Sequence, residues 1–258
     1  MKVFDDLGRG TTGFLEYAGG VAALGGEAGS YIGRFSIRYR EVFSQMALLG
    51  VQSTIIVLLT SLFTGMVVSF ESAQQAVNFG VSNLVGGAVA YTESRELGPM
   101  LSAVVVAGRA GAAITAELGA MVVTEQVEAL EALGLSPIRM LVVPRLLALV
   151  VMLPVLTIIA DVVGIVGGAS LAHTMAGIPY DTFVESVRQM SHYSDFVKGM
   201  VKAAVFGAII TLVACYQGLN TRGGAAGVGR ATTGAVVNAI IMIFVANFVL
   251  SIVLFNAG

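Results

Sequence analysis

The feature that most constrains this chain is a series of apolar runs long enough to cross a lipid bilayer. The run Val51–Phe70 contains no charged residue. At about 1.5 Å per residue it is long enough for a hydrocarbon core of about 30 Å. With 56% hydrophobic and 12% charged residues, the chain carries more apolar surface than a soluble domain could bury. The sequence therefore predicts an all-α, polytopic membrane protein.

Five transmembrane spans are expected, at about 51–70, 84–116, 141–171, 196–217 and 231–255. The second is too long for one upright crossing, so we expect it to be tilted or bent. Pro99 is the best candidate for the bend because proline lacks a backbone donor. The polar stretch 172–195 is expected to be an outer loop, with a short helix from Asp181.

Two stretches of different composition precede the first span. Residues 1–30 are glycine-rich and weakly patterned, and we expect them to be loosely ordered. From Ile32, apolar residues recur at helical spacing with arginines on the other side. This pattern predicts an amphipathic helix over 31–49 that lies in the membrane interface. The alternative, a helix packed on a soluble domain, is disfavoured because residues 31–258 read as a single membrane domain.

The distribution of arginines predicts the orientation, because positive charge is retained in the cytoplasm. In the five-span arrangement one side holds Arg34, Arg38, Arg40, Arg139, Arg145, Arg222 and Arg230. We therefore expect the N-terminus in the cytoplasm and the C-terminus on the opposite side. The formal net charge of −2 favours no nucleic-acid partner.

Charged residues within the second span are the first candidates for a functional site. A charge at the bilayer centre costs roughly 2.5–3.5 kcal/mol, so Glu93, Arg95 and Glu96 are expected to face a cavity or one another. The functional interpretation is a polar patch in a substrate cavity, and the structural alternative is a salt bridge at headgroup level. Lys202, one turn beyond Lys198 in the fourth span, completes the patch if that helix packs nearby. Otherwise it snorkels to the outer interface.

A second charged pair, Arg109 and Glu117, is spaced by eight residues and falls on roughly one helix face. We interpret it as a structural ion pair at a helix interface.

Between the second and third spans, the segment at about 119–134 is too acidic and too short to cross the bilayer. Glu125, Glu128 and Glu131 recur every three residues, with Leu130 and Leu133 on other faces. Gly134 and Pro137 end the helix. It is either a solvated loop helix or a helix that docks into another subunit.

Several enzyme motifs are missing from the sequence. It contains no GxxxxGK[ST], so the chain carries no P-loop of its own, and no HExxH or GxSxG. The two histidines, His173 and His192, have no cysteine neighbours that would complete a metal site. We therefore expect no enzyme activity, no cofactor and no metal in this chain.

Several motifs in order resemble the MlaE/YrbE family of permeases, from about residue 45 to the end. They are RELGPMLSAVVVAGRAGAAITAELGAM, TEQVEALEALGLSPIRMLVVPR, KAAVFG and GGAAGVGRATTGAVV. The resemblance implies the membrane subunit of an ABC-type transporter that moves phospholipid between the inner and outer membranes of diderm bacteria. It implies a homodimer in the inner membrane, two cytoplasmic ATPase subunits that bind the ATP, and an MCE-domain protein on the outer face.

The same resemblance assigns roles to individual residues. Arg95, Glu96 and Lys202 resemble the polar residues that line the family's lipid cavity, and the segment Glu125–Leu133 resembles its coupling helix. Asn247 is a departure, because we expect an acidic residue there in many members. We add Met66, Phe70 and Phe79, near the outer end of the first span, as candidate contacts for the lipid tails.

Two other functions compete with this interpretation. A self-contained secondary transporter driven by protons or sodium would work through Glu93, Glu96 or Asp161, and would predict inverted repeats that the sequence does not display. A non-transporting membrane scaffold would predict that Arg95→Ala and Glu96→Ala leave function intact.

Overall fold

The computed structural model describes residues 2–34 and 38–255, and within these residues the chain is helical and contains no strand. Five helical stretches in the described part are long and apolar enough to cross a membrane: Tyr39–Asn78, Ser82–Val123, Ile138–Ala176, Tyr193–Leu219 and Gly224–Phe255. The prediction of an all-α polytopic membrane protein with five spans is confirmed.

The elements follow one another with few connecting residues. In chain order they are α1 (Lys2–Gly33), α2 (Tyr39–Gln45), η1 (Met46–Gly50), η2 (Val51–Ser53), α3 (Thr54–Asn78), η3 (Ser82–Leu84), α4 (Val85–Thr92), η4 (Glu93–Leu97), α5 (Gly98–Val106), η5 (Ala107–Gly111), α6 (Ala112–Val123), α7 (Gln126–Ala132), η6 (Ile138–Val142), α8 (Val143–Ala176), α9 (Tyr180–Met190), α10 (Tyr193–Leu219) and α11 (Gly224–Phe255).

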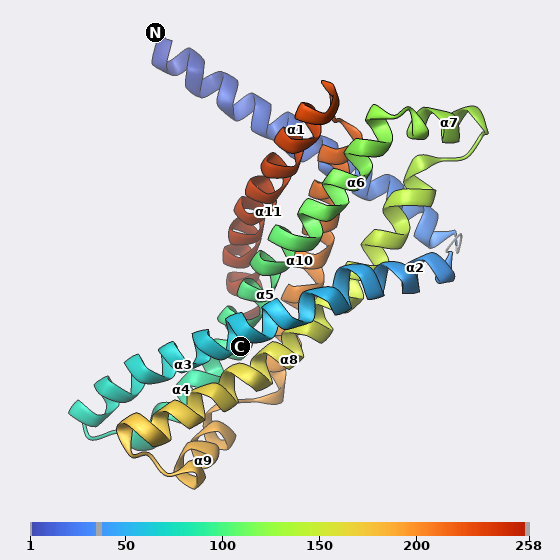
Figure 1. Cartoon of the computed structure of the whole chain (residues 1–258). Helices are drawn as coiled ribbons and strands as arrows, with labels where there is room; N and C mark the ends of the chain where they lie inside the picture. Colours follow the sequence, from blue (N-terminus) through green and yellow to red (C-terminus); the bar gives the residue numbers. More distant parts are fainter. Residues whose placement is uncertain (1, 35–37, 256–258) are drawn as a thin grey trace.

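The spans pack as two connected groups. Helix α3 lies along α8, with α4 and α9 packed at one end of this pair, while α10 packs against α8, α6 and α11. Helices α7 and α9 lie at opposite ends of the molecule (Figure 1). Because the connections at the two ends differ in this way, each end presents its own surface.

The close contact between α3 and α8 depends on small residues. The buried face of α3 has Val57, Ser61, Gly65, Ser69 and Ala73 at every fourth position. The hydroxyls of Ser61 and Ser69 donate to carbonyl oxygens of α8, at 2.6 Å and 2.7 Å. In lipid, where apolar burial does not drive association, small residues and interhelical hydrogen bonds supply this kind of contact.

The second span is interrupted by two π-helical turns, η4 and η5. Pro99 lies in the first turn of α5, directly after η4. In η4 the amide of Gly98 donates to the carbonyl of Glu93, five residues back. The irregularity expected at Pro99 is therefore a widened turn on its N-terminal side.

The expectation that residues 1–30 are loosely ordered was wrong, because the structure forms the helix α1 over Lys2–Gly33. Val21, Leu24 and Ala28 are buried in the main hydrophobic cluster, beside residues of α10. Glycine disfavours a helix by about 1 kcal/mol per residue relative to alanine, and tertiary packing of the apolar face outweighs that cost.

The amphipathic helix predicted over 31–49 also has different boundaries. Helix α1 ends at Gly33, residues 35–37 lie outside the described part of the chain, and a second helix begins at Tyr39 and runs into the first span. Tyr39 and Phe43 remain exposed, at 63% and 68%. The predicted pattern was real, but its two halves belong to different helices because the turn at Arg34 interrupts it.

The predicted outer loop 172–195 is mostly helical. Helix α8 continues to Ala176, α10 begins at Tyr193, and α9 occupies Tyr180–Met190 between them. The short helix expected from Asp181 is present and starts one residue earlier.

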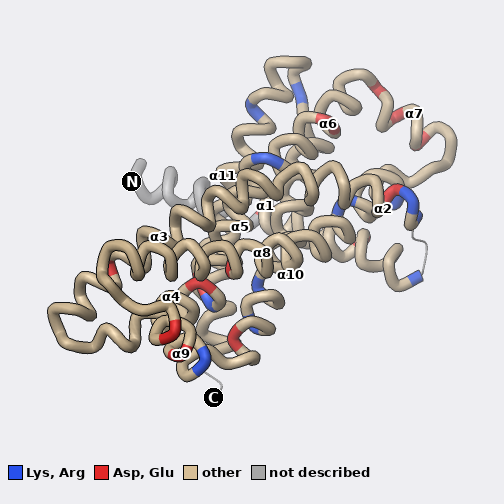
Figure 2. Tube along the Cα trace, turned by 60° about the horizontal axis from the view of Figure 1, so that its bottom comes forward, with Lys and Arg blue, Asp and Glu red and all other residues tan. Residues whose placement is uncertain are grey.

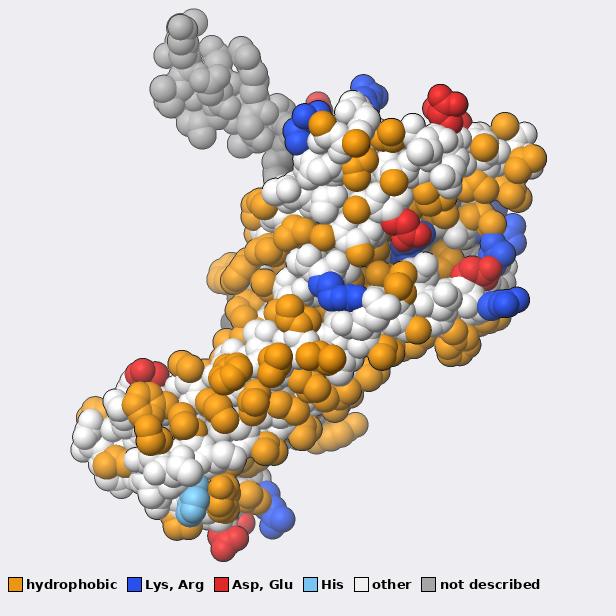
Figure 3. Space-filling view, in the orientation of Figure 1, with side chains coloured by type: hydrophobic (Ala, Val, Ile, Leu, Met, Phe, Trp, Pro, Cys, Tyr) orange, Lys and Arg blue, Asp and Glu red, His pale blue; other side chains and the backbone are white. Residues whose placement is uncertain are grey.

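Hydrophobic side chains are spread along the face seen in Figure 3, whereas most of its charged side chains lie toward the two ends. This arrangement suits a protein whose middle contacts lipid tails and whose ends contact water.

Gly65 provides a test of the α3–α8 contact. A Cβ at this position would collide with the carbonyl oxygen of Gly164, so Gly65→Ala should destabilise the protein by about 1–3 kcal/mol through overpacking. Thermal unfolding in mild detergent would measure the effect. Gly29→Ala in α1 is the matched control, because a Cβ there meets no atom within 4 Å. Equal stability of the two variants would contradict the close contact.

Candidate functional site

A polar cluster lies where η4 meets α10 and α11. In Figure 2, several acidic (red) and basic (blue) residues lie close together beside α10. The charged residues of α2, α7 and α9 form separate groups. The cluster is built around Arg95, Glu96 and Lys202. Glu93, which the sequence placed in the same predicted patch, is buried at the start of η4 and forms no bond with the cluster.

Lys202 is the centre of this cluster. Its residue is 0% exposed, so the alternative that it snorkels to the interface was wrong. The ammonium donates to Glu96 Oε1 at 2.8 Å, to Ser251 Oγ at 2.8 Å and to the carbonyl oxygen of Arg95 at 2.9 Å. An ammonium group has three donors, and all three are used.

The Arg95 carbonyl is available to Lys202 because of Pro99. In a regular α-helix this carbonyl would accept from the amide of residue 99, and proline has no such hydrogen. Lys202 supplies the missing donor from another helix. The irregular backbone of the second span and the buried charge of the fourth are therefore parts of one arrangement.

Glu96 is the exposed side of the cluster, since 37% of its side chain is accessible. Besides Lys202, it accepts from Asn247 Nδ2 at 2.9 Å on Oε2, and Ser251 Oγ lies 2.9 Å from Oε1. Asn247, noted in the sequence as a departure, thus donates to the carboxylate where a second acidic residue would repel it. The cluster keeps a single negative charge at this point.

Arg95 lies at the edge of the cluster, next to an aromatic ring. Its guanidinium stacks over Phe255, 3.7 Å from the ring centroid, and it bonds to the hydroxyl of Tyr91. Asp195 lies 3.9 Å away. The ammonium groups of Lys202 and Lys198 also approach Phe255, at 5.0 Å and 5.2 Å. Three cations around one ring, with Glu96 and Asp195 as the nearest acids, leave a small excess of positive charge.

Several members of the cluster were not selected from the sequence. Ser251 lies one turn after Asn247 in an otherwise apolar span, and two polar residues at that spacing in such a helix are a usable signal. Phe255 and Tyr91 gave no signal, because aromatic residues are ordinary at the ends of spans.

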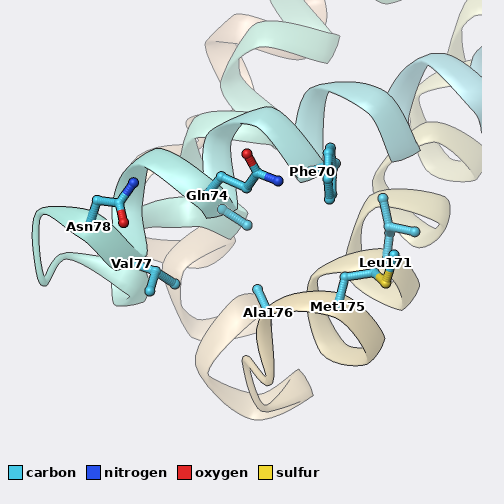
Figure 4. A pocket seen from close by; sticks show the side chains of 8 residues that line it. Phe70, Gln74, Val77, Asn78, Leu171, Met175 and Ala176 are labelled. Carbon is cyan, nitrogen blue, oxygen red and sulfur yellow. The ribbon is translucent and has the colours of Figure 1, made fainter.

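The three residues expected to contact lipid tails do not gather at this cluster. Phe70 lines a cavity of about 430 Å³ between α3 and α8, with Gln74, Asn78 and Met175 among its neighbours (Figure 4). Phe79 is 79% exposed and lines a different hollow. Met66 lies beside Gly167 of α8.

The structural ion pair expected between Arg109 and Glu117 was wrong. Arg109 donates to Gln52 and to Ser53, while Glu117 pairs with Arg145 at 2.8 Å. The π-helical turn η5 contains Arg109, so the regular spacing that would align the two side chains on one face is lost.

The acidic segment expected over 119–134 forms a shorter helix. Helix α6 continues to Val123, and α7 spans Gln126–Ala132 and has no buried residue. Glu125 precedes α7 in a left-handed conformation, with φ of 59°. Glu128 and Glu131 are exposed, Leu130 is half-buried and Leu133 is 75% exposed. The segment thus presents acidic groups and an apolar side chain to its surroundings.

Comparison with known proteins agrees with this architecture. The family model described as permease MlaE matches residues 42–253. A probable ABC transporter permease protein of Synechocystis is 40% identical over 90% of this chain and 89% of its own length. The intermembrane phospholipid transport system permease protein MlaE of Haemophilus influenzae is 36% identical over 89% of each chain. The chloroplastic protein TRIGALACTOSYLDIACYLGLYCEROL 1 of Arabidopsis thaliana is 39% identical over 92% of this chain and 68% of its own length. With its helices, its motifs and these relatives in agreement, the chain belongs to the MlaE family of permeases.

Proposed function

We propose that this protein is the membrane-spanning permease of an ABC-type transporter that moves phospholipid between the inner and outer membranes, and so maintains outer-membrane lipid asymmetry. The family match and the names of the relatives support this function. ATP is bound and hydrolysed by a separate ATPase subunit, and this chain contributes no catalytic residue and no cofactor.

The observation that carries the proposal is the polar cluster of Arg95, Glu96 and Lys202. A phospholipid combines a charged headgroup with two long apolar tails, so its site needs a few charges beside an apolar surface. Glu96 offers an accessible carboxylate, and the cations around Phe255 offer positive charge. A positive headgroup charge could pair with Glu96, and a negative one with the cations around Phe255. Lys202, whose three donors are all bonded, holds Glu96 and Arg95 in position.

The tail contacts are assigned to the outer half of α3. Met66, Phe70 and Phe79 all belong to this stretch or directly follow it, and Phe70 faces a cavity large enough for part of an alkyl chain. The distribution of these residues over several surfaces supports a path along α3 more than a single closed pocket.

The segment Glu125–Leu133 docks into the ATPase and transmits its ATP-driven movement to the spans. An isolated helix as short as α7 is not stable in water, and α7 buries no residue of its own. A docking partner would supply the missing contacts. Glu128 and Glu131 would meet basic groups of the ATPase, while Leu130 and Leu133 would enter an apolar groove.

The orientation follows from the same elements. We place α7 and the N-terminus in the cytoplasm, and α9 and the C-terminus on the periplasmic side of the inner membrane. Five spans put the ends of the membrane domain on opposite sides, and Arg139, Arg145, Arg222 and Arg230 lie at the ends of spans on the α7 side.

The partners proposed are a second copy of this chain, two ATPase subunits and an MCE-domain protein on the outer face. Helix α11 is the least buried span: 11% of its most apolar stretch is buried, against 28–50% in the others. Its exposed Phe244 and Phe248 would be covered by the second copy. The MCE-domain partner is proposed from the MlaE/YrbE resemblance.

Removing the buried charge tests the polar cluster. Lys202→Met removes the positive charge beside Glu96 and the side-chain donor to the Arg95 carbonyl, and we expect a loss of about 1–3 kcal/mol in stability and at least about tenfold in lipid transport. The double variant Glu96→Gln/Lys202→Met removes both charges, and should regain most of the stability without regaining transport. Thermal unfolding and lipid transfer by the purified complex in proteoliposomes would measure the two effects.

Arg188→Met, on the exposed side of α9, is the control for loss of a single positive charge. A stable double variant with normal transport would refute the role of the cluster and favour a scaffold.

Reversing charge on α7 tests the coupling segment. Glu128→Arg and Glu131→Arg should abolish copurification of the ATPase, while thermal stability stays within about 0.5 kcal/mol because no buried contact is changed. Affinity purification in mild detergent, followed by mass spectrometry, would identify the bound subunits. Asp181→Arg on α9, at the opposite end of the molecule, should leave the ATPase bound. Recovery of the ATPase with both α7 variants would contradict this assignment.

A further inference from the structure

Two acidic side chains are buried in the membrane domain outside the polar cluster. Glu93, at the start of η4, is 1% exposed, and Asp161, in α8, is 4% exposed. Glu93 Oε1 and Asp161 Oδ1 have no hydrogen-bond partner in the structure. Buried carboxyl oxygens without partners are costly, so this pair requires an explanation that the polar cluster does not provide.

Both carboxyls occupy space that glycines leave open at one junction. Asp161 Oδ1 lies against Gly98, where a Cβ would collide with it. Glu93 Oε1 lies 2.7 Å from the position that a Cβ would take on Gly164, one turn after Asp161, and Ser61 Oγ is 3.1 Å from the same position. Because Asp161 and Gly164 are one turn apart on α8, and the Gly98 amide bonds to the Glu93 carbonyl across η4, the two carboxyls lie close to each other. The backbones of α3, η4 and α8 therefore leave room for both groups together.

No described basic side chain forms an ion pair with either carboxyl. On the neighbouring elements, Arg95 and Tyr91 bind each other, and Arg95, Glu96 and Lys202 are engaged with α10 and α11. Asp195 of α10 lies on that same side, beside Arg95. Glu71, the charged residue of α3, is exposed. Helix α5 has no charged residue.

Two adjacent carboxylates without a counter-charge cannot both be ionised inside a membrane. Either a metal cation or a proton must neutralise them. A metal cation needs several ligands around it, and among the described residues no third His, Cys, Asp or Glu side chain joins the pair in a group that could hold one. A proton needs no such set of ligands.

We propose that Glu93 and Asp161 form a proton-binding site, which holds at least one proton between α8 and η4. The bound proton removes the repulsion at this junction and keeps η4 against α8. Release of the proton would leave two negative charges there and would push η4 away. Because η4 also carries Arg95 and Glu96, the occupancy of the site influences the position of the polar cluster. The proposal concerns proton binding alone and does not depend on the transported substrate.

Infrared spectroscopy of the purified full-length protein tests the site directly. At pH 7 we expect the band of a protonated carboxyl group in the natural protein, and loss of that band in Glu93→Gln/Asp161→Asn. Glu71→Gln, which changes an exposed acid on α3, should retain it. If the double variant does not fold, Glu93→Gln and Asp161→Asn alone should each change or remove the band. Absence of the band from the natural protein would overturn the proposal.

The pH dependence of stability provides a second measurement. The unfolded chain releases carboxyl protons near pH 4, whereas the folded protein retains one, so stability must fall as the pH rises. Per retained proton, the ratio of folded to unfolded protein should decrease by about tenfold for each pH unit above about 5, until the folded protein also releases the proton. The double variant should lose this contribution and Glu71→Gln should keep it. Identical pH profiles, or saturable stabilisation of the natural protein by sodium ions that the double variant lacks, would contradict proton binding.

Discussion

The hydrogen bond from Lys202 to the carbonyl oxygen of Arg95 connects the main irregular features of this protein. Pro99 removes a backbone donor from the second span, and inside a membrane the unpaired carbonyl has no water to bind. Lys202 supplies the donor, and Glu96 and Ser251 satisfy the rest of the ammonium group. One buried charge thereby joins η4, α10 and α11, so a proline that would weaken an isolated helix becomes a point of attachment.

The α7 segment, the polar cluster and the cavity beside Phe70 lie at different positions along the length of the molecule. The segment at α7 is exposed, acidic and poorly supported by its own packing, which suits attachment to another protein. The polar cluster lies within the spans, where its accessible carboxylate borders apolar helices. The cavity beside Phe70 lies toward the opposite end, between α3 and α8 (Figure 4). Movement at one end can reach the other through continuous helices, since α8 runs from Val143 to Ala176 without a break.

Much of this arrangement could be predicted from the sequence, because the bilayer limits the choices. The length of the apolar runs predicted the number of spans. The energetic cost of charge in a membrane predicted that Arg95 and Glu96 lie beside Lys202, but not that Glu93 lies apart from them. Long-range packing could not be predicted in the same way. The helix α1 depends on contacts with α10, and the pairing of Glu117 with Arg145 depends on how the second and third spans meet. The pairing of Arg109 with Gln52 and Ser53 also follows from a π-helical turn that no spacing rule reveals.

These π-helical turns have a mechanical consequence. A π turn holds one more residue than an α turn, so its relaxation to regular helix would rotate all that follows by about 100° about the helix axis. In η4 such a change would rotate α5, which follows it, and would disturb the bonds that join Arg95 and Glu96 to α10 and α11. Relaxation of η5, a little farther along, would rotate α6 in the same sense. Each π turn therefore sets the angular position of the segment after it: η4 sets that of α5, and η5 sets that of α6.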